Sequence, residues 1–411
     1  MPRDIVLLFA TRAVRLLAYG ALSVTLALYL AALGLTERQI GLLLTLTLLG
    51  DTAVSLWLTT RADRFGRRRT LVVGALLMVA AGVVFALCDN FLVLLIAATI
   101  GVISPSGNEV GPFLSIEQAA LSQVVADRNR TAALAWYTLA GSLATATGSL
   151  AGGLLVDALR LAAVAPLTSY RVNVAGYALM GVALVAIFSR LSPAAEAARV
   201  PSGPGARRFG LARSQGVVLR LSALFALDAF GGGFVIQALA AYWFYVRFDV
   251  RPSVLGGIFF AANLLAGLSA LLAARLATRF GLVKTMVFTH LPSNVLLVLV
   301  PLMPNLPLAI AVLLLRFSIS QMDVPTRQSY VMAVVPADER SAAAGITGVA
   351  RTTGAALAPL VAGVLLAHAA TLDLIFYLAG GLKIVYDLLL YRGFLKIRPP
   401  EETSFPLQKR P

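Results

Sequence analysis

The chain has 411 residues, of which 59% are hydrophobic and 13% are charged, and its mean hydropathy is +0.85. A soluble domain has about 25% charged and about 45–50% apolar residues, so this composition excludes a soluble globular protein and indicates a lipid bilayer as the solvent. The net charge is +15, and the chain has one cysteine, Cys88, and two histidines. An intrachain disulfide, a cysteine metal cluster and a histidine-rich metal site are therefore excluded.

Twelve stretches are long and apolar enough to cross a bilayer, which takes about 20 mostly apolar residues. In chain order they are residues 5–33, 39–60, 70–88, 91–125, 131–156, 171–190, 217–246, 253–275, 282–303, 306–335, 341–367 and 371–396. The sequence between the sixth and seventh spans is rich in proline, glycine, serine and arginine, which is typical of a flexible linker. We therefore predict an all-α membrane protein with twelve transmembrane helices in two pseudo-symmetric six-helix bundles. The predicted parts are an N-terminal bundle, a cytoplasmic linker, a C-terminal bundle and a cytoplasmic tail, at residues 1–190, 191–216, 217–398 and 399–411.

Lysine and arginine are unevenly distributed between the two sets of predicted loops. With the N-terminus in the cytoplasm, 23 of the 34 lie in inner segments, five in outer loops and six inside spans. Positive residues collect on the cytoplasmic side of a membrane, so we expect both termini in the cytoplasm, and a prokaryotic plasma membrane as the location. This distribution explains the net charge without a nucleic-acid partner, and we expect none.

The two halves of the chain contain a repeat. The loop "RADRFGRRRT", residues 61–70, lies between the second and third spans, and its Arg-Phe-Gly recurs 215 residues later. The block "EQAALSQVVADRNRTAA", residues 117–133, recurs 210 residues later as "RQSYVMAVVPADERSAA". Because both blocks lie at corresponding span ends with nearly equal offsets, they indicate duplication of a six-helix unit.

The loop at residues 61–70 resembles the loop 2–3 signature of the major facilitator superfamily, G-x-x-x-D-R-x-G-R-R. Thr59 replaces the first glycine, and the residues that match are Asp63, Arg64, Gly66, Arg67 and Arg68. With twelve spans in two sets of six, the resemblance extends over nearly the whole chain. It implies transport by alternating access, in which two halves rock around a central site, and a cytoplasmic latch built from this loop.

The chemistry of the loop suits such a gating role. Asp63 can accept charge-assisted hydrogen bonds from Arg64 or Arg67, or face the positive end of a helix in the opposite half. Gly66 permits a tight turn. We expect Asp63 to stabilise the inward-closed state; the alternative is a loop whose arginines only set the topology.

The fifth span contains a glycine-rich element, "ATGSLAGGLL", with Gly148, Gly152 and Gly153. It resembles the antiporter signature of the family, G-P-x-x-G-G, with Ser149 in place of proline. Small residues spaced four apart also let helices approach closely, which is the structural interpretation. The functional interpretation, which we favour, is an exporter that runs as an antiporter.

The fourth span gives the strongest indication of a binding site. Its 35 residues would form a helix of about 52 Å, longer than a hydrocarbon core of roughly 30 Å, and prolines and glycines surround Glu109 in "ISPSGNEVGPFLSIEQ". We predict a break near Glu109, and broken helices mark transporter sites. Charges inside a membrane are costly and burial disfavours an ionised carboxyl group, so Glu109 is the first candidate for substrate or proton binding. A kink with a buried, hydrogen-bonded carboxyl is the alternative.

The tenth span, the repeat partner of the fourth, carries Arg316, Asp323 and Arg327, with Pro325 as the expected kink. Glu117 corresponds to Arg327 at the offset of 210. In the family, the first, fourth, seventh and tenth helices line the central cavity. We therefore expect Glu117 and Arg327 to pair across it as an inner gate; the alternative is that each pairs within its own half.

The first and seventh spans supply further candidates for the cavity. Arg12 and Arg15 share one face of the first span, and Asp228 precedes Gln237 in the seventh. With Arg316 and Asp323 of the tenth span, we expect them to bind substrate or protons. Asp228 joins Glu109 as a candidate for proton coupling.

Four other polar residues in the spans receive structural interpretations. Asp51 lies near mid-depth and is expected to neutralise Arg15. Lys383 and Asp387 are four residues apart on one helix and are expected to cancel each other. His290, in the ninth span, is expected to be a packed residue.

These features favour a secondary active transporter of a small organic molecule, with proton-coupled efflux as the leading function. One alternative is a proton-coupled importer of a metabolite, which the arginines inside spans suit if it is anionic; another is a non-transporting membrane scaffold or receptor. The sequence has no G-x-S-x-G, H-E-x-x-H or G-x-x-x-x-G-K-[ST] motif, so we expect neither an enzyme nor an ATP-driven pump. We expect no cofactor or metal beyond a proton gradient, and a monomer whose partners are membrane lipid and a small-molecule substrate.

Overall fold

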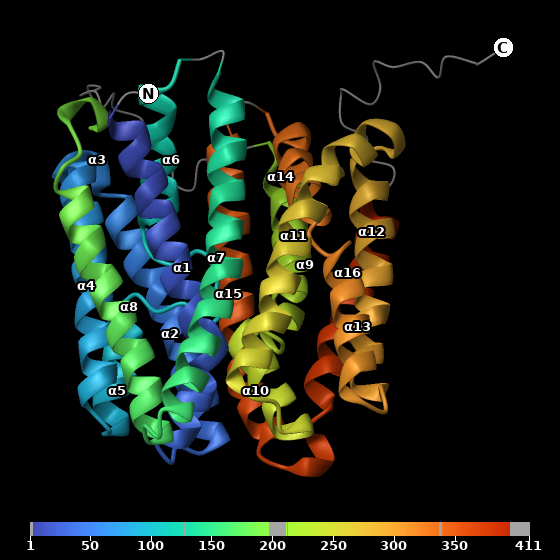
Figure 1. Cartoon of the computed structure of the whole chain (residues 1–411). Helices are drawn as coiled ribbons and strands as arrows, with labels where there is room; N and C mark the ends of the chain where they lie inside the picture. Colours follow the sequence, from blue (N-terminus) through green and yellow to red (C-terminus); the bar gives the residue numbers. More distant parts are fainter. Residues whose placement is uncertain (1–2, 127–128, 197–210, 212, 337–338, 395–411) are drawn as a thin grey trace. The chain divides into compact units, whose positions relative to one another are not determined.

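The computed structural model describes residues 3–126, 129–196, 211, 213–336 and 339–394, and their regular structure is helical (Figure 1). The first half contains α1 (Arg3–Ala32), α2 (Glu37–Thr59), α3 (Ala62–Phe65), α4 (Arg67–Leu87), α5 (Phe91–Ile100), α6 (Phe113–Val124), α7 (Arg130–Leu161), α8 (Pro166–Phe188) and the short η2 (Pro193–Ala195). The second half contains α9 (Gln215–Gly233), α10 (Gln237–Phe248), α11 (Pro252–Phe280), α12 (Leu282–Leu299), η3 (Val300–Leu302), α13 (Leu306–Phe317), α14 (Asp323–Val334), α15 (Arg340–Leu366), η4 (Ala369–Thr371) and α16 (Leu374–Phe394).

Each predicted span has its helix or pair of helices. Within the described ranges, ten helical segments are long and apolar enough to cross a membrane, and α5 and α13 are shorter apolar helices. Polar backbone groups inside a bilayer must be satisfied within the protein, and a helix does so locally. The prediction of an all-α membrane protein with twelve transmembrane helices is confirmed.

Three of the predicted spans are broken into two helices. The predicted break in the fourth span is confirmed, because residues 101–112 separate α5 from α6. The break at residues 234–236, between α9 and α10, was not predicted. In the tenth span the helix breaks at residues 318–322 and not at Pro325. Pro325 lies in the first turn of α14, where its missing N–H group leaves no helical hydrogen bond unmade, so the expected kink at Pro325 was wrong.

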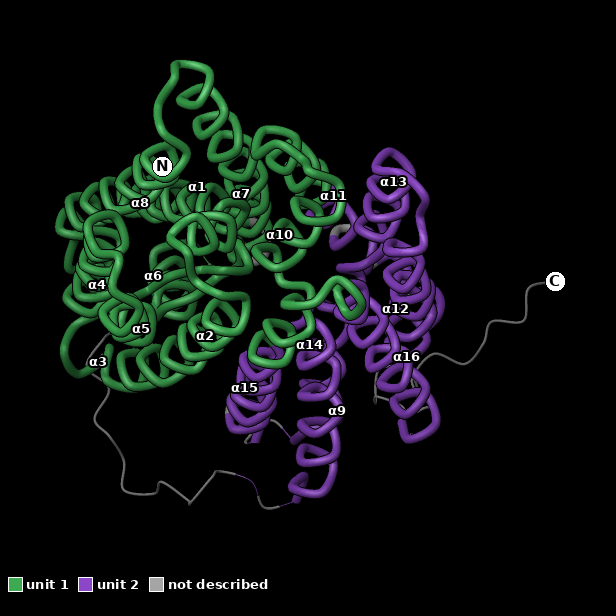
Figure 2. The backbone as a smooth tube through the Cα atoms, turned by 90° about the horizontal axis from the view of Figure 1, so that it is seen from below, with its two compact units in different colours: residues 1–200, 235–264, 359–372 green, residues 201–234, 265–358, 373–411 purple. Residues whose placement is uncertain are grey.

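The described helices form two compact units, shown in different colours in Figure 2. Unit 1 contains residues 1–200, 235–264 and 359–372, and unit 2 contains residues 201–234, 265–358 and 373–411. Neither unit is a continuous stretch of the chain. The predicted bundle boundary falls in the linker, most of which lies outside the described residues, and it stays a prediction.

Helix α1 is the centre of unit 1. It is buried at every position from residue 18 to residue 30 and packs against α7 and α8. Glycines of α7 allow this close approach: a Cβ atom on Gly148 would lie 2.0 Å from the carbonyl oxygen of Leu17, and one on Gly152 would lie 2.5 Å from that of Ala21. The glycine-rich element of the fifth span is therefore a helix-packing surface, as the structural interpretation expects.

The core of unit 2 is built by α9, α12, α14 and α16. Aromatic side chains dominate it, with Phe225 of α9, Tyr330 of α14 and Tyr386 of α16 fully buried. The charged residues of α9, α14 and α16 described below are buried among these side chains.

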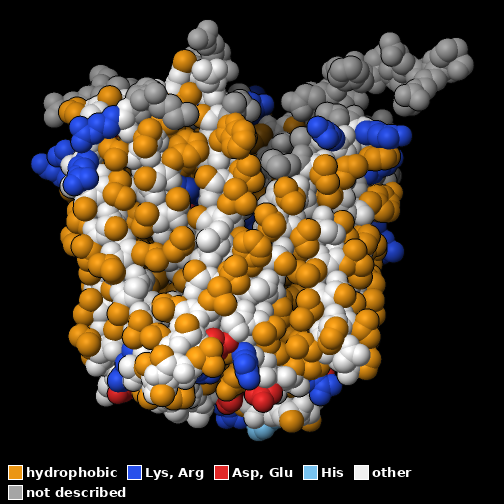
Figure 3. Space-filling model, in the orientation of Figure 1, with side chains coloured by type: hydrophobic (Ala, Val, Ile, Leu, Met, Phe, Trp, Pro, Cys, Tyr) orange, Lys and Arg blue, Asp and Glu red, His pale blue; other side chains and the backbone are white. Residues whose placement is uncertain are grey.

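The surface of each unit is suited to lipid. On the face shown in Figure 3, hydrophobic side chains cover the middle of the helices, and lysine and arginine gather toward helix ends. Large apolar side chains such as Leu92 and Leu179 in unit 1 and Leu315 in unit 2 are exposed. Exposed apolar surface of this kind is typical of contact with a membrane.

Candidate functional site

The unwound segment at residues 101–112 places Glu109 inside unit 1. Two glycines make this path available: Gly107 and Gly111 have φ angles of 70° and 79°, in the left-handed region that favours glycine. Glu109 is held in irregular backbone between two short helices and keeps 16% side-chain exposure. The segment thus presents a carboxylate that is enclosed by protein yet still accessible.

Neighbouring helices of unit 1 bind the backbone of this segment. Asp51 of α2 accepts a hydrogen bond from the N–H of Gly111 at 2.6 Å, and the N–H of Ala238 at the start of α10 donates to the carbonyl oxygen of Pro105 at 3.0 Å. Further carbonyl groups accept hydrogen bonds from the hydroxyls of Tyr19, Thr145 and Tyr177. Such pairing is what allows irregular backbone at membrane depth. Asp51 therefore supports the break, and the expectation that it neutralises Arg15 was wrong.

Four charged residues form a buried network beside the break, which we call the unit 1 ion cluster: Arg12, Arg15, Glu109 and Glu117. The Nη1 and Nη2 atoms of Arg15 bind the two carboxylate oxygens of Glu117 at 2.8 and 2.6 Å. The Nε and Nη2 atoms of Arg15 also bind Glu109, at 3.3 and 3.2 Å, and Arg12 forms an ion pair with Glu109. Two cations face two carboxylates, so the cluster is formally neutral.

The two carboxylates of this cluster differ in their surroundings. Glu117 is fully buried, and besides Arg15 it accepts hydrogen bonds from Thr11, at 2.7 Å, and from Tyr137. Glu109 has only the two arginines as side-chain partners among the described residues and is partly exposed. Glu117 therefore anchors α6 to α1, whereas Glu109 is the partly exposed carboxylate of the cluster.

A second, uncharged polar group lies in unit 1. Gln237, the first residue of α10, donates through Nε2 to Ser23 at 2.8 Å and to Ser149 at 3.0 Å. Asn263 of α11 donates to the Oε1 of Gln237 at 3.1 Å. Ser149 is the residue that replaces proline in the antiporter signature, so this departure from the signature supplies a hydroxyl to a buried network.

Unit 2 contains its own buried charges, which we call the unit 2 ion cluster: Asp228, Asp323, Arg327 and Lys383. Asp228 of α9 binds Lys383 of α16 at 2.6 Å and Arg327 of α14 at 3.2 Å. Arg327 also donates to Asp323 at 2.8 Å. One carboxylate thus connects three helices. The predicted pairing of Lys383 with Asp387 was wrong, because packing brings Asp228 to the ammonium group.

Next to this cluster, Asp387 binds His290 of α12. The Nδ1 atom of His290 lies 2.9 Å from the Oδ1 of Asp387, and Asn294 donates to its Oδ2 at 2.9 Å. On the other side of the ring, Nε2 lies 3.7 Å from the Oδ1 of Asp228. His290 is therefore not merely a packed residue, since its ring lies between two carboxylates.

The two units contain corresponding ion pairs of opposite polarity. Arg15 and Asp228 are 213 residues apart, and Glu117 and Arg327 are 210 apart, close to the repeat offsets. In unit 1 the pair joins α1, which carries the base, to α6, which carries the acid. In unit 2 the pair joins α9, which carries the acid, to α14, which carries the base. Within the described residues each charge pairs inside its own unit. The expected pairing of Glu117 with Arg327 would join the units and stays a prediction.

Two further arginines of unit 2 take no part in these ion pairs. Arg316 of α13 and Arg351 of α15 form no ion pair in the described part of the chain, and the Nε of each is buried without a hydrogen-bond partner there. Arg316 lies over the ring of Phe317, at 4.8 Å from its centroid. These guanidinium groups retain hydrogen-bonding capacity.

The loop between α2 and α4 is held within unit 1. Gly66 has a φ of 98°, which confirms the tight turn. Glu196, just after η2, accepts hydrogen bonds from the backbone N–H groups of Arg67 and Arg68 at 2.6 and 3.2 Å. Arg64 is exposed. The side chain of Asp63 lies outside the described residues, so its latch role stays a prediction.

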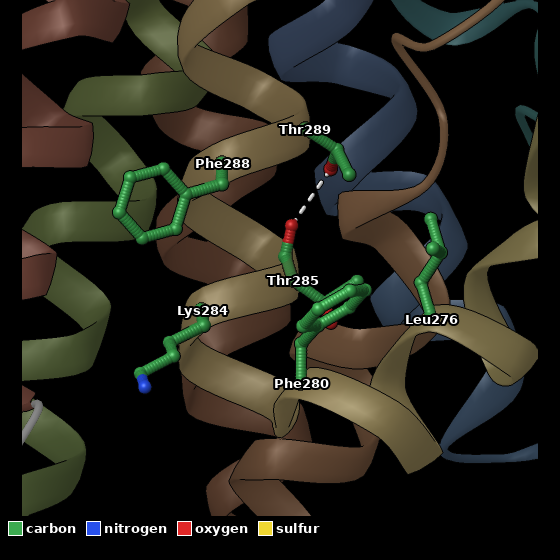
Figure 4. A pocket seen from close by; sticks show the side chains of 6 residues that line it. All are labelled: Leu276, Phe280, Lys284, Thr285, Phe288 and Thr289. Carbon is green, nitrogen blue, oxygen red and sulfur yellow. Dashed lines mark hydrogen bonds between the residues drawn. The ribbon is translucent and has the colours of Figure 1, made fainter.

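A hollow of about 440 Å³ in unit 2 lies apart from these charges, because no member of either ion cluster lines it. It is lined by Leu276, Phe280, Lys284, Thr285, Phe288 and Thr289 of α11 and α12 (Figure 4). Phe280, Lys284 and Phe288 are exposed, so this hollow opens on the outer surface of the helices. It is not the candidate transport site.

Five residues of these networks were not predicted as members from the sequence, although His290 was expected to be packed: Tyr137, Glu196, Asn263, His290 and Asn294. Two of them left a recognisable signal. His290 and Asn294 are polar, four residues apart and within an apolar span, so they share one helix face. The others are single polar residues whose partners lie far away in the chain.

Comparison with known proteins identifies the family. Residues 8–315 and 221–411 match the Major Facilitator Superfamily. The chain belongs to this superfamily. An uncharacterized membrane protein of Saccharomyces cerevisiae, YJR124C, is 32% identical over 425 aligned residues, covering 96% of this chain and 95% of the yeast protein.

Solved structures of the superfamily share the fold. A bacterial homolog to the human lysosomal transporter Spinster, inward-facing and unoccupied, has a TM-score of 0.74 at 15% identity, with 96% of this chain and 98% of that chain covered. A mutant of the nucleoside transporter NupG has a TM-score of 0.74 at 12% identity, with 95% of this chain and 100% of that chain covered. A D-xylose-proton symporter has a TM-score of 0.70 at 15% identity, with 96% of this chain and 98% of that chain covered. This protein is thus an integral, multi-pass membrane transporter with the major facilitator fold, and the matches point away from an enzyme.

Proposed function

We propose that this protein is a secondary active transporter that exports a small organic molecule in exchange for protons by alternating access. The observation that carries the proposal is the position of Glu109. It is a partly exposed carboxylate in an unwound segment, held by Arg12 and Arg15. Broken helices whose irregular backbone lies beside a polar site are the usual binding sites of secondary transporters.

The charges of the unit 1 ion cluster supply a coupling mechanism. A proton on Glu109 removes one negative charge from a formally neutral cluster, so Arg12 and Arg15 are left with Glu117 alone. Conversely, a substrate with a positive or hydrogen-bond-donating group is attracted to the ionised Glu109. Proton and substrate then compete for one carboxylate, which is the requirement for exchange. Glu117 keeps the fold of the site in both states because it is fully hydrogen-bonded.

The direction of transport and the orientation complete the proposal. Export rests on the resemblance of the fifth span to the antiporter signature. Cytoplasmic termini, in the plasma membrane of a prokaryote, rest on the distribution of lysine and arginine. The loop with Asp63, Arg64, Gly66, Arg67 and Arg68 then faces the cytoplasm, where it acts as a gate. We propose a monomer that needs no cofactor beyond the proton gradient.

One observation favours a second function, proton-coupled import of an anionic metabolite. Arg316 and Arg351 of unit 2 form no ion pair with a described residue, and a planar guanidinium group suits a carboxylate or phosphate. In that mechanism a protonated Glu109 leaves the unit 1 ion cluster with a net positive charge, and an anion enters together with the proton.

The first step of the test is to find a transported compound. The purified protein is screened by thermal shift against panels of dyes, sugars, amino acids and organic anions. Compounds that raise the unfolding temperature are then tested for counterflow in proteoliposomes. A membrane scaffold or receptor binds a compound without moving it, so binding without counterflow for every such compound contradicts transport.

The second step tests coupling. Uptake and release driven by a pH gradient are compared for the wild type, Glu109→Gln and the control Asp89→Asn, which changes an exposed acid of a loop. We expect Glu109→Gln to lose gradient-driven accumulation at least about tenfold, as expected for loss of about 1.4 kcal/mol of coupling, while the control is unchanged. Accumulation on the acidic side supports export by exchange, and accumulation on the alkaline side supports import. Wild-type coupling in Glu109→Gln overturns the assignment of Glu109.

A further inference from the structure

The arrangement of His290 in unit 2 sets it apart from the other buried polar side chains. Its ring lies between Asp387, 2.9 Å from Nδ1, and Asp228, 3.7 Å from Nε2. His290 is buried, as are both carboxylates. The second nitrogen is beyond hydrogen-bond distance, since such bonds have lengths of about 2.7–3.2 Å. One side of the ring is therefore bonded and the other only faces a carboxylate.

The bonded side fixes which nitrogen carries hydrogen in the neutral ring. A carboxylate only accepts hydrogen bonds, so Nδ1 carries the hydrogen and donates it to Asp387. The Nδ2 of Asn294 lies 3.1 Å from Nδ1 of His290 and donates to the other oxygen of Asp387 at 2.9 Å, which holds that carboxylate in place. The carboxylate is the nearer partner of Nδ1, so the hydrogen on Nδ1 points to Asp387. Asp387 and Asn294 are positioning residues in this arrangement. The lone pair of Nε2 then faces the Oδ1 of Asp228.

That geometry is repulsive in the neutral ring and attractive after protonation. A lone pair and a carboxylate oxygen at 3.7 Å repel, whereas an Nε2–H group in the same place donates toward Asp228. Oδ1 of Asp228 is also the atom that binds Lys383. A proton on His290 therefore supplies a third cation, after Lys383 and Arg327, to the carboxylate that joins α9, α14 and α16, and so weakens its dependence on Lys383.

Other charged groups surround this site. Helix α14 contributes one acid, Asp323, and one base, Arg327. Helix α16 contributes the phenol of Tyr386, whose ring centroid lies 5.9 Å from that of His290. Arg316 of α13 and Arg351 of α15, which interact electrostatically with Asp228, add positive charge to the surroundings and oppose protonation of His290. The carboxylates of Asp387 and Asp228 lie on either side of the ring, at 2.9 and 3.7 Å, so their electrostatic effect is the stronger.

We propose that Nε2 of His290 is a proton-binding atom of unit 2, positioned by Asp387, and that its protonation controls how tightly Asp228 holds Lys383 and Arg327. This inference rests on the proposed proton coupling and adds a second proton site to it, in the opposite unit from Glu109. It assigns a role to α12, a helix that contributed no residue to the predicted site.

Nitrogen NMR of histidine tests the proposal on the intact protein. The chain has only two histidines, and His368 is exposed, so it serves as the internal reference. Spectra of protein labelled with ¹⁵N-histidine are recorded from about pH 5 to pH 8, where imidazole titrates. We expect Nδ1 of His290 to remain protonated throughout, while Nε2 gains hydrogen as the pH falls. A neutral ring that carries its hydrogen on Nε2, or a ring that does not change over this range, overturns the proposal.

The variant Asp387→Asn tests the positioning role. An amide can donate as well as accept, so the preference for hydrogen on Nδ1 is lost; we expect a mixture of both neutral forms for His290 and no change for His368. An unchanged His290 spectrum contradicts the role of Asp387. If this variant does not fold, Asn294→Leu, which frees one oxygen of Asp387, is used in its place.

The outcomes separate this inference from the proposed function. Proton-driven transport in proteoliposomes together with a His290 that does not titrate leaves the function standing and refutes the second proton site. A titrating His290 in a protein that fails every counterflow assay refutes the transport proposal and leaves the proton site standing. Two variants provide a further test. We expect His290→Gln to change the pH dependence of substrate flux in proteoliposomes, and His368→Gln to leave it unchanged.

Discussion

The ion pair between Arg15 and Glu117 gives the sharpest test of how unit 1 is held together. Both side chains are fully buried and meet through two hydrogen bonds, at 2.8 and 2.6 Å. Removing one partner of a buried pair leaves an uncompensated charge and costs about 3–5 kcal/mol. We therefore expect Arg15→Gln and Glu117→Gln each to lower the free energy of unfolding by about that amount. In the double variant no charge is left unpaired at this contact, so its cost is expected to be about 2–3 kcal/mol less than the sum of the two.

The assay is unfolding in mixed detergent micelles, followed by circular dichroism, for the wild type, both single variants and the double variant. The control is Asp89→Asn, which breaks the ion pair between Asp89 and Arg171. The side chain of Asp89 is 62% exposed and that of Arg171 is 31% exposed. An exposed pair contributes about 0–1 kcal/mol. Additivity of the two single changes within about 0.5 kcal/mol, or single variants no less stable than the control, would refute the reasoning.

Three other predictions test the packing around the site. Gly148→Ala is expected to lower the free energy of unfolding by about 1–3 kcal/mol, because the added Cβ would lie 2.0 Å from the carbonyl oxygen of Leu17. The control is Gly176→Ala, where no atom lies within 4 Å of the added Cβ. Equal unfolding temperatures for the two variants would contradict the packing role of Gly148. Glu196→Gln removes a charged acceptor at the N-terminus of α4, so we expect a loss of about 1 kcal/mol and faster hydrogen exchange in its first turn; unchanged exchange would show that the contact is incidental. Gln237→Leu removes the donor to the hydroxyls of Ser23 and Ser149, which keep the bonds that they donate to backbone carbonyls, and it removes Oε1, the acceptor for Asn263. We expect a loss of about 1–3 kcal/mol, and an unfolding curve identical to that of the wild type would exclude such a contribution.

Much of the fold could be predicted from the sequence because a bilayer permits few choices. A stretch of about 20 apolar residues must satisfy its backbone internally, and a helix does so without distant partners. The break at residues 101–112 was also predictable, since its length, prolines and glycines all act locally. The break at residues 234–236 follows three consecutive glycines, Gly231 to Gly233, but glycine only permits a break, and the hydrogen bonds made by Gln237 come from other helices.

The pairing of charges was the part that sequence could not predict. Spacing shows that Lys383 and Asp387 can meet on one helix, yet Lys383 binds Asp228 and Asp387 binds His290. The rule for residues four apart applies to an exposed helix and is worth about 0.2–0.5 kcal/mol per pair. A buried charge is governed by a larger energy, the several kcal/mol of its desolvation.

The sequence by itself determined that the chain spans a membrane as helices, where the fourth span breaks, where the loop after α2 turns and which residues carry charge into the bilayer. Each of these depends on interactions among near neighbours in the chain. Only the tertiary structure decided that Arg15 binds Glu117, that Asp228 binds Arg327 and Lys383, and that His290 lies between two carboxylates. The reason is that a charge in a low-dielectric interior binds whichever opposite charge packing brings closest, and packing unites helices that are far apart in sequence.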